Sequence, residues 1–122
     1  MKEALREYYL FNLSGGRRKV KVLLSDILLV RAINGTHIDK LLYLKGDIIH
    51  TIRGHSLEEL VGLTGFLIRV NKQDLVSPNI INIIEEDAIY LTGTRGKEVP
   101  KFVTLSRTYK KVFFDFFNYK KE

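Results

Sequence analysis

Apolar and polar residues alternate along most of this chain in short runs that turn residues separate. The alternation in Lys19–Leu23 predicts a half-buried strand, and the denser apolar run at 27–33 predicts a buried one. Asn34-Gly35, a typical hairpin turn, joins that run to a partner strand at 36–44. Further strands are predicted at 8–13, 48–52, 66–70, 75–76, 79–84, 88–92 and 97–105, with turns at 14–16, 45–47, 71–74, 85–87 and 93–96.

The apolar spacing becomes helical in two places. Ser56 and Glu59 form a capping-box pattern that predicts a helix from Leu57, and Gly62 and Gly65 are expected to end it within two to three turns. Ser106 is the predicted N-cap of a second helix, at the C-terminal end of the sequence. Its apolar residues share one face, which we expect to pack against the core: Tyr109, Val112, Phe113, Phe116 and Phe117.

These elements predict an all-β fold class, mostly β with short helices. We expect an elongated arrangement of small antiparallel sheets, one short central helix and a C-terminal amphipathic helix, because strands do not alternate with long helices. The 122 residues suffice for one domain with a sizeable core. The N-terminus has charges every few residues, unlike a signal peptide, and the longest apolar runs are strand-sized, so no membrane partner is expected.

Positive charge is concentrated at both ends of the sequence. The net charge is +6, made of +4 in residues 1–24, −3 in residues 25–94 and +5 in residues 95–122. Basic segments of this kind suit an anionic partner such as nucleic acid. A basic protein without a polyanion partner remains the alternative at this point.

Residues for catalysis or metal binding are scarce. There is no cysteine, which removes disulfides and thiolate metal sites and fits a reducing, cytoplasmic location. His50 and His55 do not have the spacing of a metal-ligand pair. The glycine-containing segments 14–17 and 93–97 do not lie between a buried strand and a helix, as a phosphate loop requires. No nucleophile has an evident base, so we expect neither an enzyme nor a bound cofactor or metal.

Basic and amide side chains do gather on the connecting segments. Such side chains bind phosphates and read base edges, and the helix start at Ser106 adds free N–H groups that suit a phosphate. The candidate DNA-binding residues are Arg31, Asn34 and His37 around the first hairpin turn, Arg69, Asn71, Lys72 and Gln73 around the polar turn, and Ser106, Arg107, Thr108 and Lys110 at the second helix.

Three segments together resemble the LytTR DNA-binding domain, the effector domain of many bacterial response regulators. The first is Leu24–Val30 with Asn34-Gly35-Thr36-His37, which is similar to the family's "L-x-D-I-x-x-I-E-A-x-x-N-Y-T". The second is His55–Leu60 followed by 66–77 and 79–81, which resembles "S-L-K-E-L" and "F-x-R-I-H-R-S-Y-L-V-N". The third is Val103–Lys111, which resembles "I-P-V-S-R-R-Y-x-K-x-L".

The resemblance covers about residues 8–118 and implies a single LytTR-like domain over 1–122, without the receiver domain that often precedes it. It implies sequence-specific binding of double-stranded DNA by loops that enter the major groove, in bacterial transcription regulation. Because family members commonly occupy paired sites, a second copy on paired or repeated DNA sites is expected too. Five positions depart from the family pattern, so no operator sequence follows from it: Arg31, Asn71, Lys72, Gln73 and Thr108.

Two alternatives remain open. The first is a small all-β protein-interaction or sensory module whose basic charge is incidental. The second is an RNA-binding β domain, which needs aromatic residues exposed on a sheet face. The aromatic residues here cluster at 8–11 and on the C-terminal helix, and both groups are expected to be core.

Overall fold

The computed structural model describes residues 7–36, 38–92 and 100–118. Within them, ten strands form two antiparallel sheets, and two α-helices and two short 3₁₀ helices, η2 (Leu24–Asp26) and η3 (Pro78–Ile80), complete the fold. The seven-stranded sheet has the order β2-β1-β5-β4-β3-β7-β6, and the three-stranded sheet has the order β10-β9-β8. The strands are β1 (Tyr8–Leu13), β2 (Lys19–Leu23), β3 (Ile27–Ala32), β4 (Asp39–Leu44), β5 (Ile48–Arg53), β6 (Ile68–Arg69), β7 (Asp74–Val76), β8 (Ile81–Glu85), β9 (Ala88–Leu91) and β10 (Phe102–Thr104).

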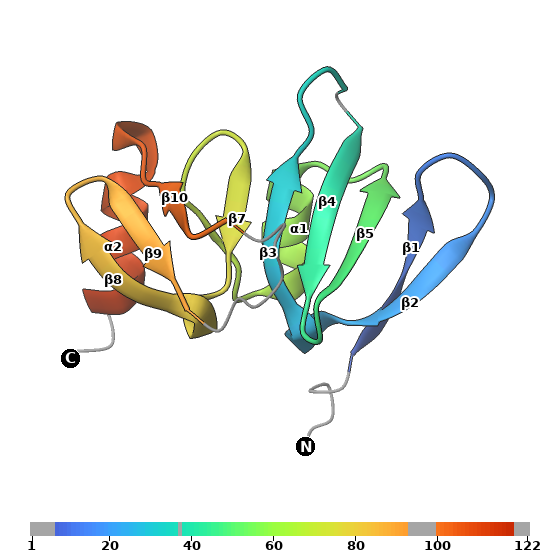
Figure 1. Ribbon diagram of the computed structural model, residues 1–122, viewed down its shortest axis with the longest axis horizontal. Coiled ribbons are helices and arrows are strands. Elements are labelled where there is room, and N and C mark those ends of the chain that lie inside the picture. The colour runs from blue at the N-terminus through green and yellow to red at the C-terminus, as the bar shows by residue number, and fades with distance from the viewer. Residues whose placement is uncertain (1–6, 37, 93–99, 119–122) are drawn as a thin grey trace.

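Both helices lie where their end signals place them. α1 (Leu57–Thr64) has the predicted capping box, in which Ser56 Oγ accepts from the Glu59 N–H at 3.0 Å and Glu59 Oε1 accepts from the Ser56 N–H at 3.0 Å. It runs through Gly62 and ends at Gly65, whose φ of +79° is the left-handed conformation that glycine favours. α2 (Arg107–Asn118) packs beside the three-stranded sheet (Figure 1).

Two hydrophobic clusters hold the layers together. One joins α1, through Leu57 and Leu60, to one face of the large sheet, and the other joins α2, through Phe113, to the small sheet. Neighbouring residues of β3 point into different clusters, Val30 into the first and Leu29 into the second. Burial on both faces explains why this strand is apolar at nearly every position.

Several loops of the large sheet lie at the same end of its strands, which we call the loop edge. Arg31 pairs with Asp74, Ala32 with Lys40, and Asp39 with Arg53, so the ends of β3 and β5 lie beside the starts of β4 and β7. The loops after β1 and β3 and the loop before β7 therefore lie along the upper edge in Figure 1. This edge brings together segments that are far apart in the sequence.

The predicted fold class is confirmed, and so is the position of most elements. Several strands differ from the prediction: β4 begins at Asp39, β6 covers two residues, and β10 begins at Phe102. β8 begins at Ile81, because residues 79 and 80 of the predicted strand belong to η3. The expected turn at 93–96 lies outside the described residues. Among the described helices, none is both long and apolar enough to cross a membrane.

Two predictions of burial are wrong in part. Phe113 is fully buried, but Val112 on the same predicted stripe is 61% exposed, because α2 meets the sheet along a line narrower than its apolar face. Tyr8 is 54% exposed although its neighbour Phe11 is completely buried, since alternate residues of a strand point to opposite faces. Tyr90 and Phe102, which belong to neither of the two aromatic groups expected to be core, are exposed as well and pair across β9 and β10.

Candidate nucleic-acid interface

An open groove of about 760 Å³ lies at the loop edge of the large sheet. It is bounded by the end of β3, the loop before β7, strand β10 and the start of α2. Seven of the eleven candidate residues line it, together with residues that the sequence did not indicate. The lining residues are Arg31, Ala32, Asn34, Asn71, Lys72, Gln73, Asp74, Phe102, Val103, Thr104, Ser106, Thr108 and Tyr109.

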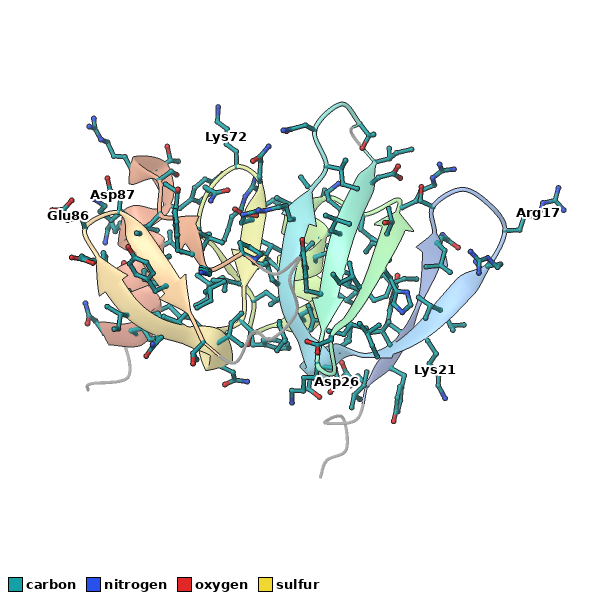
Figure 2. The ribbon with its side chains drawn as sticks, in the orientation of Figure 1. Arg17, Lys21, Asp26, Lys72, Glu86 and Asp87 are labelled. Carbon is teal, nitrogen blue, oxygen red and sulfur yellow. The ribbon has the colours of Figure 1, made fainter. Side chains whose placement is uncertain are left out.

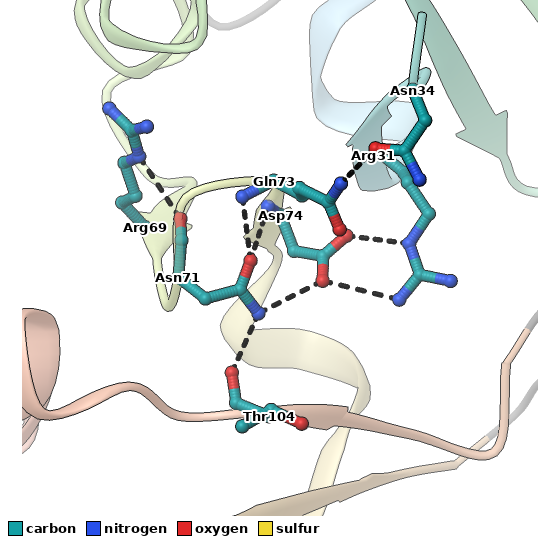
Figure 3. A network of polar contacts seen from close by, with 7 residues as sticks. All are labelled: Arg31, Asn34, Arg69, Asn71, Gln73, Asp74 and Thr104. Carbon is teal, nitrogen blue, oxygen red and sulfur yellow. Dashed lines mark hydrogen bonds and ion pairs between the residues drawn. The ribbon is translucent and has the colours of Figure 1, made fainter.

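Asp74 is the centre of a polar network beneath the groove. Its side chain is only 4% exposed, and both of its oxygens accept from Arg31, Oδ1 from Nε at 2.7 Å and Oδ2 from Nη2 at 3.2 Å. Hydrogen bonding to Asp74 raises the pKa of Arg31 above its usual value, and partial burial opposes this only in part. Arg31 is therefore held as a fixed cation by a carboxylate from another strand (Figure 3).

Asn71 uses its whole side chain inside the protein. Its Oδ1 accepts from the N–H groups of Gln73 and Asp74 at 2.7 and 2.9 Å. Its Nδ2 donates to Asp74 Oδ2 at 3.0 Å and to the Thr104 carbonyl at 2.7 Å. An amide offers two acceptor and two donor positions, so four bonds saturate it. Asn71 shapes the turn and holds it against β10 (Figure 3).

The first hairpin loop and the loop before β7 are tied to each other. The Ala32 N–H donates to the Gln73 carbonyl at 2.8 Å, and Gln73 Nε2 donates to Asn34 Oδ1 at 2.5 Å. The Asn34 amide nitrogen and the Gln73 amide oxygen have no hydrogen-bond partner among the described residues, and both residues are exposed. One donor and one acceptor thus remain available on a braced pair of loops.

Arg69 braces the same loop from the other side. It donates to the carbonyls of Asn71 and Lys72 at 3.1 and 3.0 Å, and it pairs with Glu58 of α1 at 2.5 Å. Its guanidinium also lies 5.0 Å from the centre of the Tyr109 ring. With a side chain only 20% exposed, Arg69 positions the loop and does not line the groove.

Lys72 projects from the loop that these contacts hold. Its side chain is exposed, and Figure 2 shows it pointing away from the body of the protein. Its ammonium group makes no hydrogen bond or ion pair to any residue in the described part of the chain, whereas its carbonyl is fixed by Arg69. A cation on a rigid loop is thereby presented to solvent.

The start of α2 closes the groove. The Ser106 N–H donates to the Val70 carbonyl at 2.9 Å, which fixes the helix start to the loop after β6. Arg107 and Thr108 are exposed, and Arg107 has no ion-pair partner in the described ranges. Lys110 instead pairs with Asp87 of the β8–β9 turn at 3.0 Å and does not line the groove. His37 lies outside the described residues.

The sequence missed the internal partners, above all Asp74, Glu58 and Thr104. A signal for one of them existed: Arg31 interrupts an apolar run that predicts a buried strand, and a charge in such a place needs a partner. No local signal identifies Thr104, because its backbone carbonyl makes the contact.

The described residues contain no group of three or more histidine, aspartate or glutamate side chains placed to hold a metal ion. The side chains that line the groove are mainly cationic, amide and hydroxyl groups, with a few aromatic rings. Such a surface suits an anionic ligand with hydrogen-bonding edges.

Comparison with known proteins bears on the fold. No protein-family model and no curated protein sequence matches the chain. A solved structure does: the LytTr DNA-binding domain of a putative methyl-accepting/DNA response regulator from Bacillus cereus, with a TM-score of 0.65 over 90% of this chain and 95% of that one, at 18% identity. The chain has the LytTR fold. The resemblance carried by the sequence motifs is thus confirmed as a likeness of fold.

Proposed function

We propose that this chain is a sequence-specific, double-stranded DNA-binding regulator of bacterial transcription, acting in the cytoplasm without catalysis or a cofactor. The observation that supports it best is the groove at the loop edge, which is lined by Lys72 and by the amide groups of two braced loops, with exposed Arg107 beside it at the start of α2. Neither Lys72 nor Arg107 has an ion-pair partner among the described residues. The fold is that of a protein described as a DNA-binding domain.

In this proposal the two braced loops enter the major groove, which is about 12 Å wide. Lys72, Asn34 and Gln73 read base edges, because their free polar atoms face solvent. Arg107, beside the N–H groups of the α2 start, holds a phosphate. The proposed unit is the single domain over residues 1–122, and two units occupy paired or repeated sites.

Selection from random duplexes followed by binding at several salt concentrations tests this proposal. We expect one enriched sequence, and a slope of log K against log salt of about −4 to −7 if roughly four to eight phosphates are contacted. A slope near zero would refute binding to a polyanion and favour the protein-interaction alternative.

One observation keeps a single-stranded RNA ligand as a second candidate. Tyr90 and Phe102 are exposed on the small sheet with ring centres 5.6 Å apart, and exposed aromatic pairs on a sheet can stack on unpaired bases. Competition separates the two ligands. Single-stranded RNA that displaces the selected duplex at equal concentration, with Tyr90→Ala weakening RNA binding alone, would favour RNA.

A further inference from the structure

The β1–β2 loop, residues 14–18, belongs to none of the segments assigned to DNA above. It carries two adjacent arginines, Arg17 and Arg18, and both side chains are exposed. Figure 2 shows Arg17 at one end of the long axis, pointing into solvent. Two adjacent exposed guanidinium groups create a local positive potential that attracts an anion.

Ion pairing separates the arginines into two groups. Arg31, Arg53 and Arg69 each lie within 4 Å of a carboxylate, that of Asp74, Asp39 and Glu58 respectively. Arg17, Arg18 and Arg107 have no such partner among the residues that the structure describes. Arg107 belongs to the proposed DNA interface. Arg17 and Arg18 resemble it, because each has an exposed guanidinium group that can bind an external anion.

The loop is rigidly attached and is not a loose arm. The Leu13 N–H donates to the Arg18 carbonyl at 2.9 Å and closes the loop. The Ser14 N–H donates to the Thr51 carbonyl of β5 at 2.9 Å, and Ser14 Oγ donates to Asp39 Oδ2 at 3.1 Å. Phe11 and Val22 of the same hairpin are buried in the core cluster of α1. The backbone at both ends of this loop is therefore already ordered in the folded protein, which lowers the entropic cost of binding a ligand there.

These anchors place the loop on the edge that presents Lys72. Asp39 opens β4, directly after the first hairpin loop, so the Ser14–Asp39 bond joins the two loops. β1, which leads into the arginine loop, and β7, which follows Lys72, are four strand spacings apart in the sheet. At about 4.8 Å per spacing this is about 19 Å, the length of roughly six base pairs.

We propose that Arg17 and Arg18 bind backbone phosphates of the same duplex, just beyond the base pairs that the braced loops read. This inference rests on the proposed function and extends its footprint at one end. The arginines lie at one end of the loop edge, outside the loops proposed to enter the major groove. Their contact with phosphates therefore adds affinity and fixes the register of the protein on DNA without reading a base.

The test compares two double variants of the full chain. R17A/R18A removes the two free arginines, and the matched control K21A/K45A removes two exposed lysines, Lys21 on the β2 face and Lys45 in the β4–β5 turn at the opposite edge. We expect R17A/R18A to weaken binding roughly 10- to 60-fold at about 0.1 M salt, equally for selected and scrambled duplexes, and to make the salt slope shallower by about 1.8. The control should stay within about threefold of the wild-type Kd, with unchanged melting temperature in both variants.

Shortening the duplex shows where the contact lies. Removing about six base pairs from one flank of the selected site should weaken the wild-type protein and leave R17A/R18A unaffected, while removing the other flank should affect both equally. Suppose that the wild-type complex depends on salt and that Lys72→Ala weakens it. If R17A/R18A then binds as tightly as the wild type, or loses no more affinity than K21A/K45A, this inference alone is overturned. If the wild-type protein binds no duplex, the proposed function fails with it.

Discussion

The Asn71 network supports a quantitative prediction, because sequence and structure give this residue different roles. From the sequence, Asn71 is a candidate DNA-binding residue, whereas in the structure all four of its hydrogen-bonding positions are used internally. Asn71→Ala removes the four bonds at once and leaves Asp74 with one partner fewer. The variant therefore tests whether the residue holds the loop or reads a base.

The size of the effect follows from the surroundings of each bond. The two bonds to Asp74 are partly buried and are worth about 1 kcal/mol each, and the two bonds to the Gln73 N–H and the Thr104 carbonyl are exposed and are worth about 0.5 kcal/mol each. We expect Asn71→Ala to lower the free energy of unfolding by about 3 kcal/mol, a large part of the 5–15 kcal/mol typical of a domain.

Urea unfolding followed by circular dichroism measures this loss as a lower midpoint with an unchanged slope. Asn71→Asp keeps an acceptor oxygen but replaces the NH₂ group that donates to Asp74 with a carboxylate oxygen. The two carboxylates then repel each other, so this variant should be at least as destabilised as Asn71→Ala. Gln73→Ala, which removes one exposed side-chain bond to Asn34, is the mild control at about 0.5 kcal/mol. The reasoning is refuted if Asn71→Ala unfolds within about 0.5 kcal/mol of the wild type, and Asn71 is a base reader if that variant loses preference at one base pair.

Three further outcomes are expected. Phe113→Ala should lower stability by about 3–5 kcal/mol because its ring is fully buried, whereas Val112→Ala, on an exposed residue of the same helix, should change it by less than about 0.5 kcal/mol; equal effects in thermal melts would contradict the packing of α2. Ser56→Ala should cost about 1 kcal/mol through loss of the α1 cap, and wild-type stability would argue against the cap. Lys72→Ala should lose about 1–3 kcal/mol of binding free energy and relax preference at one base pair, while Arg107→Ala weakens all duplexes alike; binding to the selected and a scrambled duplex distinguishes them, and wild-type affinity in both would remove these residues from the interface.

The sequence alone determined the elements of this fold with few errors. Strand alternation, the Asn34-Gly35 turn and the Ser56–Glu59 capping box are local signals, because each depends on residues only a few positions apart. These signals predicted nearly all the strands and both helices. The loops that they predicted between these elements contain many of the basic and amide residues. The motifs added the fold family, since their order along the chain is the order of the elements.

The tertiary structure decided which of those polar residues are free. Arg31 and Asp74 are 43 residues apart and Asn71 and Thr104 are 33 apart, and only the pairing of β3 with β7 and the approach of β10 bring them together. The same residue types therefore serve two ends: Arg31, Arg69 and Asn71 brace the loops, whereas Lys72, Arg17 and Arg107 face solvent without partners in the described chain. Local pattern fixes the conformation of a segment, but whether a charge is paired depends on what long-range packing places beside it, which no window of the sequence contains.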